Sequence, residues 1–96
     1  MLSRDHFIFT IGYDGPAAVV DSQGARRYGS LSTAELAEKG LFRAAWASAV
    51  FSGDAGEKAL VVEAYNKAAG TSYGAGGLPD RLFGVFPVNV KRAILL

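Results

Sequence analysis

The segment from Asp54 to Gly70, DAGEKALVVEAYNKAAG, carries the signals of a complete α-helix. Asp54 is a favourable N-cap residue, and Glu57 has the spacing from which a carboxylate can accept the backbone N–H of the cap, as in a capping box. Gly70 can adopt the left-handed conformation in which many helices end. The consecutive apolar residues 59–62 indicate that other elements cover this helix on several sides. We therefore expect it to be the central core helix.

Two shorter helices are expected before this segment. Ser32 and Glu35 have the spacing of a second capping box, and Gly40 predicts the end of the first helix. A single helix that continues through Gly40 is the alternative, at a cost of about 1 kcal/mol relative to alanine. Residues 41–51 place apolar side chains at spacings of three and four, which is the pattern of an amphipathic helix.

The N-terminal part of the chain favours antiparallel strands. Residues 6–13, HFIFTIGY, alternate with period two and are rich in β-branched and aromatic side chains. Turn residues follow at 14–16, and 17–21 predict a second strand. A turn at 22–24 and a short third strand at 25–28 complete the expected meander. Such a sheet is only marginally stable unless a helix covers one face.

The C-terminal part is less regular. Residues 71–77, TSYGAGG, have the composition of a loop, and 78–84 predict one helical turn. Residues 85–88 should be extended, because a residue that precedes proline avoids the helical region. Asn89 can cap a last helix over 90–96, with a terminal strand as the alternative, since so short a segment shows too little periodicity to decide.

These expectations define an α+β fold, with an N-terminal two- or three-stranded antiparallel meander packed on three or more helices. A chain of 96 residues buries roughly 60 to 65% of the surface that its unfolded form exposes. Half of the residues are apolar and 20% are charged, which is typical of a folded protein rather than a disordered one. We expect a single small globular domain that spans residues 1–96.

The composition excludes several kinds of site. The chain has no cysteine, which excludes disulfides, thiolate nucleophiles and zinc sites with sulfur ligands. His6 is the only histidine, so one chain cannot build a structural zinc site. No group of acidic residues has the spacing of a calcium loop. We therefore expect neither a metal nor a cofactor.

The sequence predicts a cytoplasmic protein that has no membrane association. The first residues, MLSRDHFIF, lack the basic region, the long apolar stretch and the small-residue cleavage site of a secretory signal. No apolar run approaches the length of a membrane span. The formal net charge of +1 creates no strong field toward nucleic acid or acidic lipid, so such a partner would require a local basic patch.

Residues 32–51 have the outline of a helix-turn-helix, and the segment TAELAEKG resembles the first helix of DNA-binding examples of that motif. The spacing differs, because Ala37 and Gly40 are three apart where the motif usually has four. The second helix offers only Arg43 and Ser48 as base readers. An ordinary helical hairpin is the preferred interpretation, with nucleic-acid binding as the alternative.

A candidate anion- or partner-binding patch consists of Arg26, Arg27, Tyr28 and Arg43. Two cations beside an aromatic ring can clamp a phosphate, stack on a base or receive an acidic peptide. On a strand, however, Arg26 and Arg27 would project to opposite faces. Solvated arginines whose stems pack over apolar surface are the simpler interpretation. Tyr73 and Gly74 mark a candidate binding loop.

Catalysis has little support in the sequence. A nucleophile needs an adjacent base, and His6 is the only imidazole, while the carboxylates are scattered. The apolar first strand and the tail 93–96, AILL, instead predict surface that association would bury. We therefore expect a non-catalytic assembly or protein-interaction module, most simply a homodimer. The alternative is a small nucleic-acid-associated protein that uses the basic patch and the helical hairpin.

Overall fold

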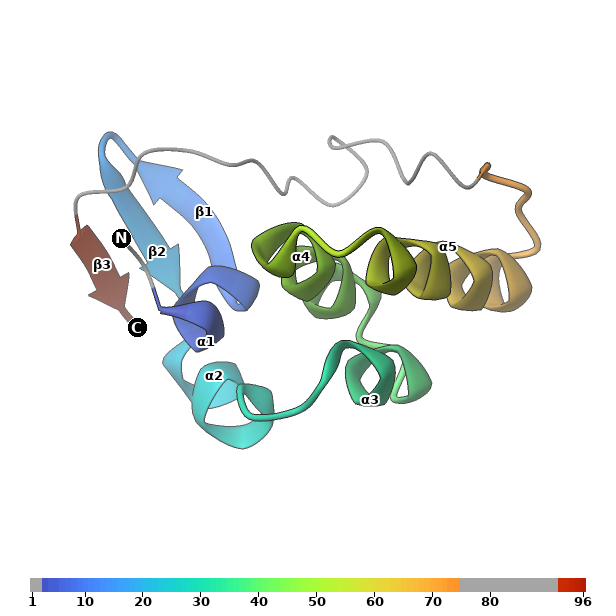
Figure 1. Ribbon diagram of the computed structural model, residues 1–96. Helices are drawn as coiled ribbons and strands as arrows, with labels where there is room; N and C mark the ends of the chain where they lie inside the picture. Colours follow the sequence, from blue (N-terminus) through green and yellow to red (C-terminus); the bar gives the residue numbers. More distant parts are fainter. Residues whose placement is uncertain (1–2, 75–91) are drawn as a thin grey trace.

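The computed structural model describes residues 3–74 and 92–96, and these form an α+β fold (Figure 1). The described elements follow one another as α1 (Arg4–Ile8), β1 (Thr10–Asp14), β2 (Ala17–Val20), α2 (Ser22–Tyr28), α3 (Thr33–Glu38), α4 (Phe42–Ser52), α5 (Ala55–Ala69) and β3 (Arg92–Leu95). The sheet lies at one end of the molecule and the last turns of α5 lie at the other (Figure 1). The helical turn expected at 78–84 and the extended segment expected at 85–88 lie outside the described residues.

The capping box and the break at Gly40 are confirmed. Ser32 Oγ accepts the Glu35 N–H at 3.1 Å, and Glu35 Oε1 accepts the Ser32 N–H at 3.0 Å. Gly40 has a φ of 76°, a conformation that glycine adopts readily and that interrupts a helix. For this reason α3 and α4 are two helices that meet at a turn, rather than one.

The caps of α5 are confirmed, although the capping box expected between Asp54 and Glu57 does not form. Asp54 Oδ1 accepts the Glu57 N–H at 3.0 Å, and Gly70 ends the helix with a φ of 69°. The backbone N–H of Asp54 donates to Ser52 Oγ at 3.2 Å instead of to Glu57. The Glu57 carboxylate accepts a hydrogen bond from Thr33 of α3. The Glu57 side chain, which the capping box would have used, therefore makes a tertiary contact instead.

The central helix is α4, so the prediction that α5 is central was wrong. Residues 44–49 of α4 are all buried, and the helix packs against α1, α3 and α5. Most of these residues are alanines, whose small side chains let neighbouring helices approach closely. On α5, Val61 and Val62 are buried, whereas Leu60 is 39% exposed. The described helices beside α5 therefore cover only part of its apolar surface.

The sheet is mixed, so the predicted antiparallel meander is confirmed for its first two strands only. β1 and β2 pair antiparallel, from Thr10 opposite Val20 to Asp14 opposite Ala17, with a bulge between Thr10 and Gly12. β3 pairs with β2 in parallel, and the described strands have the order β1-β2-β3. The third strand is therefore the C-terminal one, which confirms the strand alternative for the end of the chain.

The strand predicted for 6–13 begins only at Thr10, because the residues before it form α1. In the described sheet, β2 offers partners only for Thr10 to Asp14. The Phe9 carbonyl still accepts the Asp21 N–H at 2.9 Å, but residues 4–8 lie before this pairing, and a helix satisfies their backbone groups locally. The helical conformation also places Ile8, which is 3% exposed, in the main core.

α2 takes the place of the turn and third strand that were predicted for 22–28, and this part of the prediction was wrong. Asp21 caps the helix, since its Oδ1 accepts the Gly24 N–H at 3.2 Å. A Cβ at Gly24 would lie 2.8 Å from the Phe9 ring, so glycine here allows close packing rather than a turn. The Phe9 ring also stacks on Tyr28 with 6.4 Å between centroids. Contacts with Phe9, which is distant in sequence, thus favour the helix.

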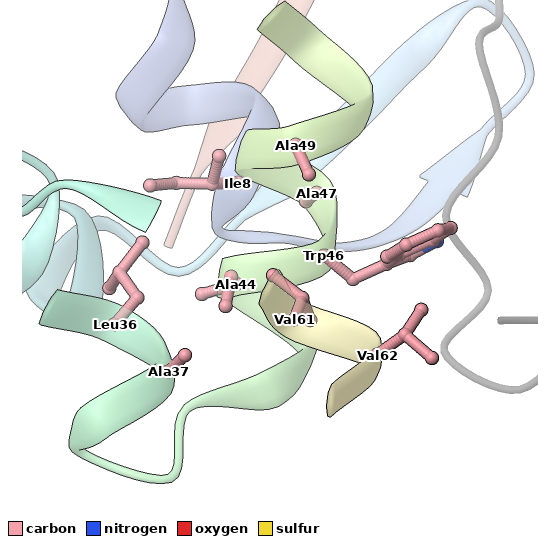
Figure 2. Close-up of a cluster of buried hydrophobic side chains, with 10 residues drawn as sticks. Ile8, Leu36, Ala37, Ala44, Trp46, Ala47, Ala49, Val61 and Val62 are labelled. Carbon is pink, nitrogen blue, oxygen red and sulfur yellow. The ribbon is translucent and has the colours of Figure 1, made fainter. Parts of the chain in front are cut away.

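Two apolar clusters form the described core. The larger one surrounds α4, and Figure 2 shows Ile8 and Leu36 on one side of that helix with the Trp46 ring on the other. The smaller cluster contains Ala18, Val20 and Ala25, between the sheet and α2. Phe9 packs against both clusters and so joins the helices to the sheet.

Candidate functional site

Four polar side chains form a chain of hydrogen bonds across α1, α3, α4 and α5. Arg4 Nη2 donates to Ser48 Oγ at 2.8 Å, Ser48 Oγ lies 2.7 Å from Thr33 Oγ1, and Thr33 donates to Glu57. A carboxylate can only accept hydrogen bonds, so Thr33 donates its hydroxyl proton to Glu57. Ser48 must therefore be the donor to Thr33 Oγ1. Two buried hydroxyls thus connect a guanidinium to a carboxylate.

Arg4 also donates hydrogen bonds to two backbone carbonyl groups. Nη1 donates to the carbonyl oxygen of Gly29 at 2.8 Å, and Nη2 donates to that of Leu31 at 2.7 Å. Both carbonyls belong to the connection between α2 and α3. Because these bonds are charge-assisted, they are stronger than neutral ones. Arg4 therefore fixes α1 and this connection relative to α4.

A hollow of about 480 Å³ opens beside this chain and has solvent on one side. Its volume lies within the range of about 300–1,000 Å³ that is usual for ligand sites. Its apolar lining includes Leu31, Phe51 and Leu60, and Phe51 and Leu60 remain 41% and 39% exposed. Arg4 and Glu57 contribute its charged groups beside Glu35. Apolar surface next to a few fixed polar groups is the usual composition of a binding site.

Glu35 contributes a second carboxylate to the hollow. Its pKa is lowered from the ordinary value of 4.5, mainly because its carboxylate accepts the backbone N–H of Ser32, with a further contribution from the Ser32 side chain. A hydrogen bond to the charged form favours that form. Glu35 is therefore ionised at neutral pH.

The sequence-based candidates do not belong to this hollow. Arg26 and Arg27 lie in the last turn of α2 and are both exposed, and the Arg27 guanidinium lies 5.7 Å from the centroid of the Tyr28 ring. On a helix the two arginines are neighbours around the axis, so they do not project to opposite faces as a strand would require. Their position at a helix C-terminus is also electrostatically favourable without any ligand.

Arg43 lies on a different part of the fold from these two arginines. It is half-buried in the first turn of α4, near Tyr13 of β1. Partial burial raises the pKa of Tyr13, and the positive charge of Arg43 opposes that shift. α2 packs mainly on α1, whereas α4 packs on α1, α3 and α5. Arg43 thus belongs to the surroundings of β1.

The loop that contains Tyr73 and Gly74 is held to the end of α5. Asn66 Nδ2 donates to the Tyr73 carbonyl at 2.9 Å, and Asn66 Oδ1 accepts the Tyr73 N–H at 3.0 Å. The rings of Tyr73 and Tyr65 are 6.1 Å apart. Gly74 is exposed. These contacts order the start of the predicted loop by packing it on α5.

The helical hairpin of α3 and α4 differs from a DNA-binding helix-turn-helix in what it exposes. A recognition helix must present one face to the major groove. In α4, residues 44–49 are buried, including Ser48, which was considered as a base reader. The hairpin therefore packs the core.

Sequence reasoning missed the four residues of the hydrogen-bonded chain as a group. Ser48 is a single hydroxyl within a run of alanines, and this is the one local signal that it could have a buried partner. Glu57 fits a helix-capping pattern, and this local role explained the residue without any tertiary contact. Arg4, Thr33, Ser48 and Glu57 are far apart in the chain and meet only when the four helices pack.

In the described residues, no group of three or more His, Cys, Asp or Glu side chains is placed to hold a metal ion. None of the helices within residues 3–74 and 92–96 is long and apolar enough to cross a membrane. Comparisons with family models, curated proteins and solved structures found no match for this chain. The class of the protein is therefore defined by its fold alone. It is a small α+β protein with an open hollow between its helices.

Proposed function

We propose that the protein is a non-catalytic assembly module that forms a homodimer through one end of its sheet. The observation that carries this proposal is the exposure of Ile11 and Leu95, which are 51% and 54% exposed. Thr10, Val20 and Leu95 lie in one row across the three strands, and Ile11 follows Thr10. The exposed aliphatic residues of β1 and β3 thus lie at the same end of the sheet, whereas Tyr13, the other exposed apolar residue of β1, lies nearer the opposite end.

A second copy of the chain is the partner that this surface fits. The charged residues of the described strands, Asp14 and Arg92, stand in the row at the opposite end of the sheet. A two-fold interface places the same patch of each subunit against the other. A patch built from Ile11 and Leu95 can meet its own copy without placing like charges of the strands face to face, and the contact removes apolar surface from water.

Burial of the hydroxyl groups supports a non-catalytic role. Thr33 donates to a carboxylate, which is the arrangement of a nucleophile beside a base. Thr33 is only 4% exposed and Ser48 only 2%. Both residues line the hollow, but their hydroxyls are engaged in hydrogen bonds within the protein, and little of either residue is accessible to a substrate. The hydrogen-bonded chain is therefore assigned to holding the fold together.

Size-exclusion chromatography with light scattering, at several protein concentrations, tests the dimer. We expect a dimer for the parent chain and a monomer for Leu95→Asp and for Ile11→Asp, because a buried unpaired carboxylate is costly. Leu60→Asp is the matched control, since Leu60 is an exposed leucine on α5. A parent that stays monomeric at every concentration contradicts the proposal, as does a control that dissociates equally.

The nucleic-acid alternative rests on one observation, the two neighbouring exposed arginines Arg26 and Arg27 on α2. A dimer held by apolar contact should survive moderate salt, whereas binding through phosphate contacts weakens steeply as salt rises. Titration of a fluorescent oligonucleotide at two salt concentrations separates the two functions. Salt-sensitive binding that Arg26→Ala with Arg27→Ala removes would favour the alternative.

The proposal keeps the cytoplasmic location that the sequence predicts, together with the absence of a cofactor. Fractionation of the source cells, followed by immunoblotting, tests the location. Recovery of the protein in the membrane or extracellular fraction would contradict it. Native mass spectrometry of the purified protein tests the cofactor, since a retained small molecule would appear as added mass.

A further inference from the structure

The hollow beside Arg4 and Glu57 is separate from the sheet end that the dimer uses. It lies between helices, and its exposed apolar residues are Phe51 at the end of α4 and Leu60 on α5. The Phe51 ring also packs on Phe7 of α1, with 5.6 Å between ring centroids. The proposed dimer interface does not cover the hollow, so the hollow needs an explanation of its own.

The positive charge in the hollow is directed into the protein. Arg4 donates three hydrogen bonds to protein acceptors, namely the carbonyls of Gly29 and Leu31 and the hydroxyl of Ser48. These bonds hold the guanidinium against the backbone. An anionic ligand would have to compete with them for Arg4, and it would also meet the carboxylates of Glu35 and Glu57.

The negative charge is better placed to meet a ligand. Glu57 is half-buried and accepts one hydrogen bond from Thr33. A carboxylate has about four acceptor positions on its two oxygens, so this bond leaves capacity for a further donor. With Glu35 also ionised, the hollow has two carboxylates against one guanidinium. A cation is therefore the complementary charge.

We propose that this hollow binds a primary ammonium group on an aliphatic stem, with the nitrogen at Glu57 and the stem over Phe51 and Leu60. Both halves of such a ligand find their counterpart here. The ammonium donates to the Glu57 carboxylate, and the aliphatic stem packs on the Phe51 ring and the Leu60 side chain. The stem covers apolar surface that solvent otherwise meets. A lysine side chain of a partner protein and a free aliphatic amine share this chemistry.

NMR titration of the ¹⁵N-labelled full chain tests the site directly. The probes are hexylammonium chloride, 1-hexanol and sodium hexanoate at matched ionic strength, together with an acetylated and amidated Ala-Lys-Ala peptide. We expect hexylammonium to shift the amides of residues 33–35, 51–52 and 57–60 and to bind more tightly than hexanol or hexanoate. Tighter binding of the peptide than of the amine identifies a protein partner, whereas the reverse identifies a free amine.

Two variants assign the binding to the proposed residues. Glu57→Gln keeps an oxygen that can accept the Thr33 hydroxyl but removes the charge, and it should weaken hexylammonium binding roughly fivefold. Leu60→Ser should weaken binding by shortening the apolar contact. Glu63→Gln, on the exposed side of α5, is the matched control and should bind as the parent does.

Three outcomes would overturn the inference. Equal binding of hexanol would mean that the hollow recognises only apolar surface. Tighter binding of hexanoate would mean that Arg4 determines the ligand. The absence of shifts from every probe, in a protein whose spectrum shows it folded, would mean that the hollow is no site. Each result is independent of the oligomeric state, so the dimer proposal stands or falls separately.

Discussion

At the scale of single residues, the buried hydroxyls of Thr33 and Ser48 are satisfied by neighbouring side chains, whereas the buried Trp46 Nε1–H has no hydrogen-bond partner among the described residues. Thr33 and Ser48 are nearly inaccessible to water, and each has a partner on another helix. A buried hydroxyl without a partner costs about 1–3 kcal/mol, so such a chain is stable only when every member is present. The chain also fixes the relative positions of α1, α3, α4 and α5 more specifically than alanine contacts can.

Removal of one side chain from the hydrogen-bonded chain therefore lowers the free energy of unfolding by more than the size of that side chain suggests. We expect Ser48→Ala to lower the free energy of unfolding by about 1–3 kcal/mol, because Arg4 and Thr33 each lose a partner in a buried position. Ser30→Ala, at an exposed serine that lines the hollow, should change it by less than about 0.5 kcal/mol. Urea unfolding followed by circular dichroism measures both. Equal effects of the two substitutions would contradict the role of the chain.

The Glu35 carboxylate makes the α3 cap dependent on pH. Its pKa is lower in the folded state than the ordinary value of 4.5, chiefly because it accepts the Ser32 N–H. The stabilisation is therefore fully present above 4.5 and is lost as the pH falls through the folded pKa.

Thermal unfolding between about pH 6 and pH 3 tests this dependence. Glu35→Gln should lower the melting temperature at the upper end of the range and converge with the parent at the lower end. Glu38→Gln, on the same helix but outside the capping box, is the control for the loss of one carboxylate. A difference between Glu35→Gln and the parent that stays constant with pH would contradict the prediction.

At the scale of elements, the packing of α4 determines which faces of its neighbours are buried. Apart from Arg43, α4 consists of apolar or small residues, as expected of a helix with neighbours on several sides. α5 has comparable apolar residues but, among the described elements, packs mainly on α3 and α4, and part of its apolar surface stays exposed. Consecutive residues of α5 therefore differ sharply in burial, with Val61 at 0% exposure and Leu60 at 39%.

Two adjacent substitutions on α5 test this difference in burial. Val61→Asp should unfold the protein, because it places an unpaired charge in the core. Leu60→Asp should remain folded, with a loss of no more than about 1 kcal/mol from the exposed apolar contact. Circular dichroism and the dispersion of the amide proton spectrum report the outcome. Two variants that behave alike would contradict the assigned orientation of α5.

At the scale of the whole molecule, stability should decrease from α4 toward both ends of the fold. The larger core cluster surrounds α4, whereas the sheet contributes to a smaller cluster of small side chains. The last turn of α5 is exposed, at residues 67–69, and lies at the far end from the sheet (Figure 1). Segments with few buried apolar contacts open at lower free energy than the core does.

Hydrogen exchange measured by NMR shows this gradient residue by residue. The amides of residues 45–49 in α4 should exchange only through global unfolding and be the slowest of those described. The amides of 67–69 should exchange faster by at least about a hundredfold, because the helix end frays locally. Similar protection in the two segments would mean that the fold opens as one cooperative unit and would contradict the gradient.

Local signals in the sequence were sufficient for the elements whose ends are defined by their own residues. The Ser32 capping box, the break at Gly40 and the caps of α5 at Asp54 and Gly70 were all predicted, since such signals act within a few residues. The hairpin of β1 and β2 followed from turn residues and alternation in the same way. The α+β class could be predicted from these elements together.

Tertiary contacts decided the remaining features. The start of β1 depended on the length of its partner strand, and α2 depended on the Phe9 ring against Gly24. The parallel position of β3 required contact between distant parts of the chain. The hollow likewise exists only where four helices meet. The sequence by itself determined the helix caps and the first hairpin, because those interactions are local; packing decided which helix is central and which polar groups meet.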